Sequence, residues 1–222
     1  MRLIERLNGG FGVSARVAGY APTAALVLAV PGVAAFVAPG DWRTSVVPWF
    51  FAAIPACFAV TCLGLVRLHR SRWVTVGGAW TALAMLGISG FFLAVGIGGL
   101  TGLQDLPEDQ LGLLAWLPII SFGFGFLSMT PALAVTAWAT QRADVVPRWG
   151  VWTLWLLAPL LAVIFIVGGN GPAPFDELAA PVGLSVIMLG WVVIGQALLR
   201  AHDARTGLDS VPADHDVSVD VG

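Results

Sequence analysis

Long apolar runs alternate with short polar segments along the chain, and this pattern predicts six membrane-spanning helices. A helix needs roughly 17 to 25 mainly apolar residues to cross the hydrocarbon core of a bilayer. Runs of about this length are found at residues 18–39, 46–66, 74–100, 111–140, 149–169 and 180–199. The predicted fold class is therefore an all-α membrane protein, built as a six-transmembrane-helix bundle over residues 18–199.

The two ends of the chain have a different pattern. In residues 1–17, Leu3, Ile4 and Leu7 fall on one helical face, which predicts a short amphipathic helix on the cytoplasmic membrane surface. Residues 200–222 are rich in Asp and contain no aromatic residue, which predicts a disordered acidic tail. The first span follows several Arg residues, as a signal peptide does, but it is longer than a signal h-region and is expected to be retained.

Composition supports the membrane assignment. The chain has 222 residues, of which 58% are hydrophobic and 11% are charged, and its mean hydropathy is +0.87. A soluble domain carries about 25% charged residues, so this chain cannot cover itself with a polar surface. The basic residues form no continuous stripe, which argues against nucleic-acid binding.

The distribution of arginine predicts the direction of the helices. All 11 basic residues are Arg. If the N-terminus is cytoplasmic, every Arg except Arg43 falls on the cytoplasmic side, which is a strong positive-inside pattern. We therefore expect a plasma-membrane protein with both termini in the cytoplasm.

The segment "RLHRSR" is the most basic stretch of the chain and contains Arg67, Arg70 and Arg72. We interpret it chiefly as a topology determinant in the second connecting loop. The alternative is a contact surface for anionic lipid headgroups or for a cytoplasmic partner such as an ATPase.

The six spans contain no Asp, Glu, Lys, Arg or His. Ionisable groups inside a membrane mark proton relays and ion pathways, and intramembrane metal or haem sites need side-chain ligands such as His. The sequence therefore predicts no catalytic residue, no metal site and no cofactor. The segment "GISG" matches the GxSG pattern of rhomboid-type proteases, but Ser89 has no His in a later span to accept its proton. We therefore expect Gly87 and Gly90 of this segment to be close-packing positions.

Small residues recur at four-residue intervals in two spans. Such stripes allow helix backbones to approach closely, either within the bundle or against another membrane subunit. The expected packing positions are Ala21, Ala25, Ala29, Gly90, Ala94 and Gly98.

The fourth span has 30 residues, which is longer than a straight helix needs, and Pro118 and Pro131 are expected to tilt or kink it. Pro55 and Pro159 lie at similar depths in their spans, and such a match favours an inverted three-plus-three repeat with a binding site between the halves. The candidate solute-lining residues are Thr61, Ser121, Ser128, Thr130 and Pro131.

Of three classes of function, an enzyme acting at the membrane interface has no cluster of acids, bases or nucleophiles in the sequence to support it. Two classes remain open. The first is a permease-type protein, or the membrane subunit of a transporter, for a neutral or hydrophobic solute. The second is a non-catalytic accessory or scaffold subunit of a membrane complex. A permease should have a polar cavity at mid-depth near Thr61, Ser128 and Thr130, whereas a scaffold should be solid there.

Overall fold

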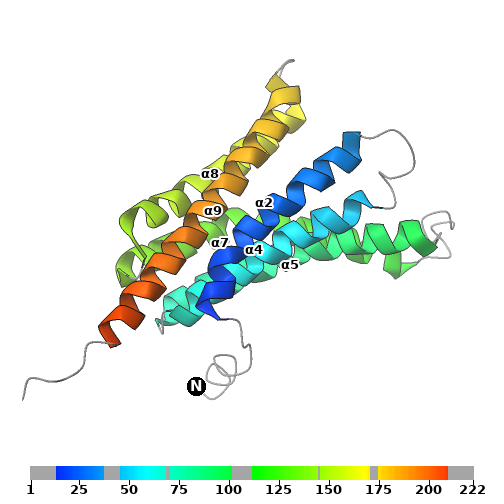
Figure 1. Ribbon diagram of the computed structural model, residues 1–222. Coiled ribbons are helices and arrows are strands. Elements are labelled where there is room, and N and C mark those ends of the chain that lie inside the picture. Colours follow the sequence, from blue (N-terminus) through cyan, green and yellow to red (C-terminus); the bar gives the residue numbers. More distant parts are fainter. Residues whose placement is uncertain are drawn as a thin grey trace, which may run out of the picture.

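The computed structural model describes the backbone of residues 14–37, 46–68, 71–101, 112–144, 146–170 and 175–209, and most side chains within these ranges. This part of the chain is all-helical (Figure 1). Its helices are α2 (Ala15–Val37), α4 (Val47–Leu68), α5 (Arg72–Thr101), α7 (Leu113–Ala143), α8 (Arg148–Asn170) and α9 (Phe175–Asp209).

Among the described residues, α2, α4, α5, α7 and α9 each contain a segment that is long and apolar enough to cross a membrane. The helical form follows from the environment that such sequences require, because every backbone polar group must be satisfied internally in lipid. The protein is thus a helical protein with several helices of transmembrane length. The count of six spans remains a prediction.

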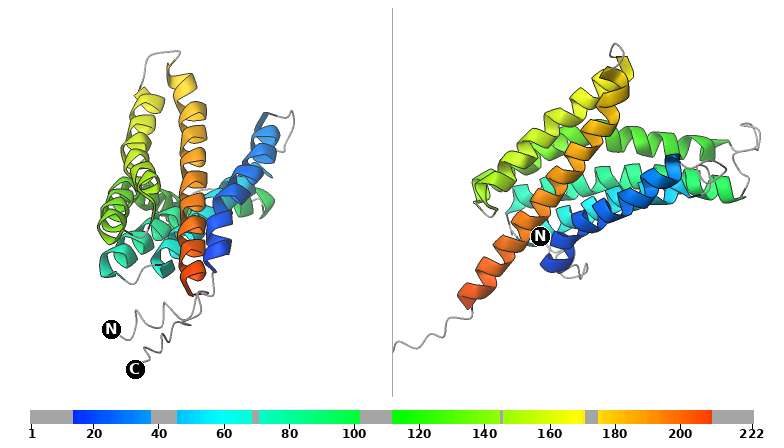
Figure 2. Two further views of the ribbon diagram at one scale, coloured as in Figure 1. Left: turned by 60° about the vertical axis from the view of Figure 1, so that its left-hand side comes forward. Right: turned by 45° about the horizontal axis from the view of Figure 1, so that its top comes forward.

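The helices pack in the order of the chain. Each helix contacts the next one along the sequence, and α9 returns to contact α2, so that the six form a closed ring. The far ends of α8 and α9 lean away from those of α5 and α7 (Figures 1 and 2). Since neighbouring helices alternate in direction, the start of α2 and the end of α9 lie at the same end of the molecule (Figure 2).

The core is apolar and filled by both large and small side chains. Trp191 of α9 is fully buried, and its ring stacks on Phe58 of α4 with 5.0 Å between centroids. Ala18, Ala25 and Leu133 are also completely buried within the same cluster. Close packing of this kind fixes one arrangement of the helices.

Helix α7 is continuous over 31 residues although Pro118 and Pro131 both lie inside it. It ends at Ala143, and Asp144 follows in the left-handed region with φ of 49°. Asp tolerates this conformation better than most residues and suits a helix end.

Helix α9 continues to Asp209, beyond the predicted end of the last span at residue 199. Residues 200–206 include no Gly or Pro that would stop the helix. The sequence predicts an N-terminal amphipathic helix over residues 1–17, of which residues 1–13 lie outside the described residues. Residues 210–222, which make up most of the predicted acidic tail, also lie outside them.

Candidate functional site

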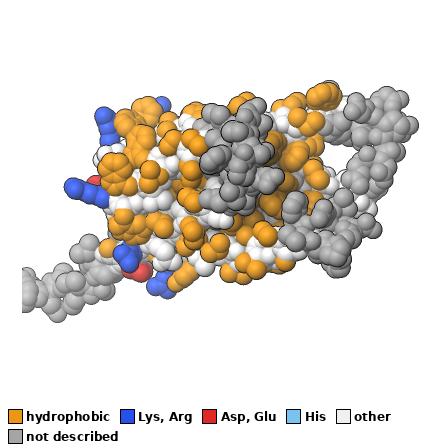
Figure 3. Space-filling view, turned by 90° about the horizontal axis from the view of Figure 1, so that it is seen from above, with side chains coloured by type: hydrophobic (Ala, Val, Ile, Leu, Met, Phe, Trp, Pro, Cys, Tyr) orange, Lys and Arg blue, Asp and Glu red, His pale blue; other side chains and the backbone are white. Residues whose placement is uncertain are grey.

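The arginine residues of the described helices gather at one end of the bundle. Arg16, Arg72 and Arg148 lie in the first turns of α2, α5 and α8, whereas Arg67 and Arg142 lie in the last turns of α4 and α7. Figure 3 shows these cationic side chains at one edge of the molecule, with apolar side chains covering its flank. This end is therefore where the protein can attract anions.

The segment "RLHRSR" includes the last residues of α4 and the first residue of α5. Arg67 and Arg72 are both exposed, while His69 and Arg70 lie outside the described residues. The start of α5 is stabilised by the hydroxyl of Thr75, which donates a hydrogen bond to the backbone carbonyl of Ser71 at 3.1 Å.

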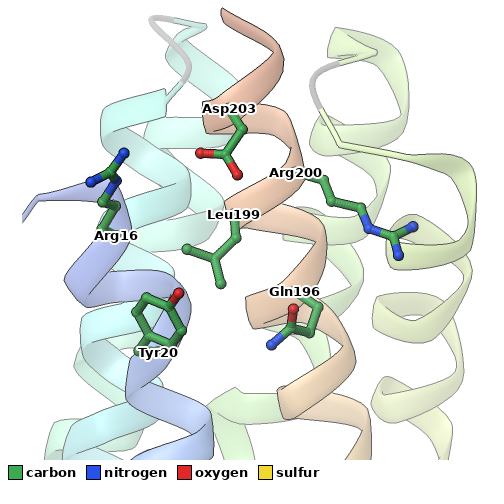
Figure 4. Close-up of a pocket in the computed structure, with 6 residues that line it drawn as sticks. All are labelled: Arg16, Tyr20, Gln196, Leu199, Arg200 and Asp203. Atoms are coloured by element: carbon green, nitrogen blue, oxygen red, sulfur yellow. The ribbon is translucent and has the colours of Figure 1, made fainter. Parts of the chain in front are cut away.

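A polar cavity of about 370 Å³ lies between α2 and α9 at the arginine-rich end (Figure 4). Arg16 and Tyr20 of α2 line one side, and α9 contributes the other side chains. The α9 residues are Gln196, Leu199, Arg200 and Asp203. Leu199 is buried, and the other residues are exposed.

The floor of this cavity depends on two glycines at the crossing of α2 and α9. A Cβ atom at Gly19 would collide with the side chain of Leu199, and one at Gly195 would collide with the backbone carbonyl of Gly19. The absence of both Cβ atoms brings the two backbones together, so that polar side chains one turn away share one space.

Arg200 is held at the rim of the cavity by an aromatic ring of a third helix. Its guanidinium carbon lies 5.4 Å from the ring centroid of Trp149 on α8. This cation–π contact keeps a positive charge beside a Trp of the kind that anchors helices at membrane interfaces.

A second cavity of about 320 Å³ lies at the same end, between the start of α5 and the end of α7. It is lined by Ser71, Trp73, Trp138, Ala139, Arg142 and Ala143. The rings of Trp73 and Trp138 meet edge to face at 5.7 Å, and Arg142 lies 4.5 Å from the Trp138 centroid.

The five predicted solute-lining residues do not line either of these two cavities. Thr61 is fully buried and donates to the carbonyl of Ala18 on α2 at 3.0 Å. Ser121 donates to the carbonyl of Gly87 on α5 at 3.1 Å. Ser128 and Thr130 are half-buried on α7, and Pro131 is exposed.

The predicted packing residues occupy varied environments. Ala21 and Ala25 of α2 are buried, and Ala29 is half-buried. On α5, Gly90 and Ala94 are half-buried, and a Cβ atom at Gly98 would meet no described atom within 4 Å.

The tightest approaches of α5 and α7 are at three glycines, of which the sequence predicts Gly87 as a close-packing position and does not single out Gly77 or Gly125. A Cβ atom at Gly77 would lie 3.0 Å from the backbone of Thr136. One at Gly87 would lie 2.8 Å from the carbonyl oxygen of Ser121, and one at Gly125 would collide with the carbonyl of Ala84.

Ser89 of the "GISG" segment forms a hydrogen bond at the interface between α5 and α4. It is buried, and its hydroxyl donates to the carbonyl of Ala52 on α4 at 2.7 Å. Within the described residues, no cluster of three or more His, Cys, Asp or Glu side chains forms a metal site.

The comparisons with protein-family models, with curated proteins and with solved structures find no match to this chain. The class of protein consequently follows from composition and fold alone. Several long apolar helices with charged residues at their ends define a multi-pass helical protein suited to a membrane.

Proposed function

We propose that the protein is a non-catalytic accessory or scaffold subunit of a membrane complex. The observation that carries this proposal is the state of the buried hydroxyl groups in the described helices. Thr61, Thr81, Ser89, Thr136 and Thr140 are the buried polar side chains, and each hydroxyl has a hydrogen-bond partner within the protein. Thr61, Ser89 and the pair formed by Thr81 and Thr136 bond between helices, and Thr140 bonds within its own helix. These bonds leave the hydroxyl groups unavailable for a solute.

The contact surface for the partner in this proposal is a cluster of phenylalanines that joins three helices. Phe51 of α4, Phe91 and Phe92 of α5, and Phe122 and Phe126 of α7 form consecutive ring pairs with centroids 4.8 to 6.4 Å apart. Each ring is half-buried. Paired aromatic rings are a rigid surface that another helix can pack against with little loss of side-chain freedom.

Site-specific photocrosslinking in native membranes tests this proposal. A photoreactive residue at Phe91 or Phe122 should capture one membrane protein, whereas the same residue at Leu83, which is 59% exposed elsewhere on α5, should label lipid. Equal protein capture at all three positions, or lipid labelling alone at both Phe positions, would exclude the Phe cluster as the contact surface.

A permease for a neutral solute is the second candidate, and one group favours it. Within the described part of the chain, the buried Nε1 atom of Trp191 has no hydrogen-bond partner. A buried donor without an acceptor is costly, and a polar solute would satisfy it. Solute flux into vesicles that contain the purified protein, lost in Trp191→Phe, would establish this function over the scaffold.

The orientation and the repeat belong to the same proposal. We propose that the protein lies in the plasma membrane with both termini in the cytoplasm. This orientation is supported by the Arg residues that gather at the end where α2 begins and α9 ends. The three-plus-three repeat remains a prediction. The order of contacts around the ring is preserved when α2, α4 and α5 are exchanged for α7, α8 and α9, but the additional contact of α4 with α9 has no comparable counterpart between α8 and α5 in the described residues.

A further inference from the structure

We propose that the cavity between α2 and α9 is a specific site for the phosphodiester headgroup of an anionic glycerophospholipid of the phosphatidylglycerol type. This site is independent of the scaffold role. It is also distinct from the "RLHRSR" segment, because none of its lining residues comes from the end of α4 or the start of α5.

The first argument is the chemistry of the lining. Arg16 and Arg200 both line the cavity, with Leu199 and Asp203 between them, but their guanidinium groups point in opposite directions and that of Arg200 is turned toward α8 (Figure 4). Arg16 is therefore the main candidate for a phosphate contact, and Arg200 contributes mainly its charge. A guanidinium presents a fork of N–H donors that suits phosphate oxygens. The hydroxyl of Tyr20 and the amide of Gln196 are neutral hydrogen-bonding groups in the same cavity, and they suit the hydroxyls of a glycerol headgroup.

The second argument is charge. The two guanidinium groups and the single carboxylate of Asp203 give the cavity one net positive charge. A phosphodiester carries one negative charge and matches it. A phosphomonoester carries about −1.5 to −2 at pH 7 and would meet repulsion from Asp203.

The third argument is the surface that continues from the cavity toward the middle of the bundle. On α2, the exposed face that bears Arg16 and Tyr20 continues through Ala24 and Val27. These positions follow one another at helical spacing, and Val27 is 65% exposed. The face thus changes from cationic to aromatic to aliphatic along its length.

Helix α9 repeats the same change in the opposite chain direction. Its exposed face runs from Arg200 and Gln196 to Val193 and Leu189, of which Leu189 is 55% exposed. Since α2 and α9 are antiparallel and in contact, their two polar ends meet at the cavity. A polar pocket that leads onto two apolar stripes fits a headgroup with attached acyl chains better than it fits a free phosphate ester.

The size of the cavity agrees with this ligand. About 370 Å³ lies at the lower end of the range for small-molecule sites. It holds a headgroup, while the acyl chains remain on the outside of the bundle.

Native mass spectrometry of the purified full-length protein tests the proposal. We expect one tightly retained phosphatidylglycerol, with weaker retention of phosphatidylcholine, phosphatidylethanolamine and phosphatidic acid. Arg16→Gln should weaken phosphatidylglycerol retention about fivefold, as expected for one Arg at a membrane surface. Arg200→Gln should have a similar or smaller effect.

Arg148→Gln is the matched control, because Arg148 is exposed at the same end and does not line the cavity. An equal loss of phosphatidylglycerol retention in all three variants would show that the lipid responds only to the general positive charge of this end, and it would overturn the proposal. Tighter binding of a zwitterionic lipid or of phosphatidic acid would overturn the charge argument. Binding of soluble glycerophosphoglycerol, the deacylated phosphodiester, as tight as that of the lipid would show a phosphate-ester site instead of a lipid site and would overturn the proposal. The thermal unfolding temperature in lipid-free detergent should be the same for Arg16→Gln and Arg148→Gln. This result would establish that the compared proteins are equally folded.

Discussion

Single small residues decide how closely the helices of this protein approach. The clearest case is Gly125 of α7, where an added Cβ would collide with the backbone carbonyl of Ala84 on α5. Backbone atoms cannot move aside as a flexible side chain does, so both helices would have to shift. Gly98 on α5 is the opposite case, since an added Cβ would have no described atom within 4 Å.

Gly125→Ala should therefore lower the stability of the bundle by roughly 1–3 kcal/mol, the usual cost of overpacking a core. Gly98→Ala should be neutral or should stabilise the helix by up to about 1 kcal/mol, because Ala has the higher helix propensity. Thermal unfolding in detergent measures both. A loss of stability at Gly98 equal to that at Gly125 would show that the close approach of α5 and α7 is not the cause.

These glycines also show what the sequence pattern can and cannot predict. The pattern correctly predicts long apolar helices, because apolar runs of transmembrane length have few alternatives. It selects only some of the glycines that pack, because α5 carries glycines on several faces. Gly87, which the pattern predicts, and Gly77, which it does not, both lie against α7, whereas an added Cβ at the predicted Gly98 would have no described atom within 4 Å. Only the neighbouring helix determines which face is used.

Ser89 leads to a second prediction at a single position. Ser89→Ala removes the hydrogen bond to Ala52 and should cost about 0.6 kcal/mol, with an upper value of about 1.7 kcal/mol for a hydrogen bond between membrane helices. The wild-type protein should not react with a fluorophosphonate probe, because a serine nucleophile needs an adjacent base. Labelling that disappears in Ser89→Ala would reveal a serine nucleophile and contradict the structural role.

Pairs of helices are joined by polar contacts that their sequences do not predict individually. Three side-chain hydroxyl groups donate to a backbone carbonyl of a neighbouring helix. Thr61 of α4 bonds to α2, Ser89 of α5 bonds to α4, and Ser121 of α7 bonds to α5. Between α8 and α7, the indole of Trp155 donates to Gln141 at 3.0 Å. A lone Ser or Thr in an apolar run can satisfy itself within its own helix, so the sequence alone leaves its partner helix undetermined.

The contact between Thr81 of α5 and Thr136 of α7 is the best test of such a link. Their hydroxyl oxygens are 2.9 Å apart, and each also lies within hydrogen-bond distance of a carbonyl oxygen in its own helix. Because each hydroxyl carries one proton, one of the two donates across the interface and the other donates within its own helix. A double-mutant cycle with Thr81→Val and Thr136→Val should give a coupling energy of about 0.6 kcal/mol in thermal or denaturant unfolding. Val keeps the volume of Thr and so limits the effect to the hydroxyl.

The matched control is Thr153→Val on α8. Thr153 is partly exposed and donates at 2.8 Å to the carbonyl of Trp149 in its own helix. Its combination with Thr81→Val should be additive. If the effects of Thr81→Val and Thr136→Val on the free energy of unfolding were also additive, their hydroxyl groups would contribute nothing to stability across the interface.

The molecule as a whole is polarised, with cationic side chains at one end and apolar helices over its flank (Figure 3). The sequence predicts this polarity well, because the position of each Arg relative to the apolar runs is enough to place it. It does not predict the cavity between α2 and α9. Tyr20 and Gln196 come from the first and last described helices, and they meet only because the ring of helices closes.

The gathering of Arg side chains at one end of the molecule predicts its orientation in the membrane, which cysteine labelling can test. Ala204→Cys places a thiol on an exposed position at the arginine-rich end of α9, and Thr101→Cys places one at the opposite end, at the last residue of α5. If the positive charges face the cytoplasm, a membrane-impermeant maleimide should label Thr101→Cys in intact cells and Ala204→Cys only after the membrane is opened. The parent protein controls for the two native thiols, of which Cys62 is fully buried. Labelling of Ala204→Cys in intact cells would reverse the orientation. It would also move the proposed headgroup site to the outer leaflet without changing its chemistry.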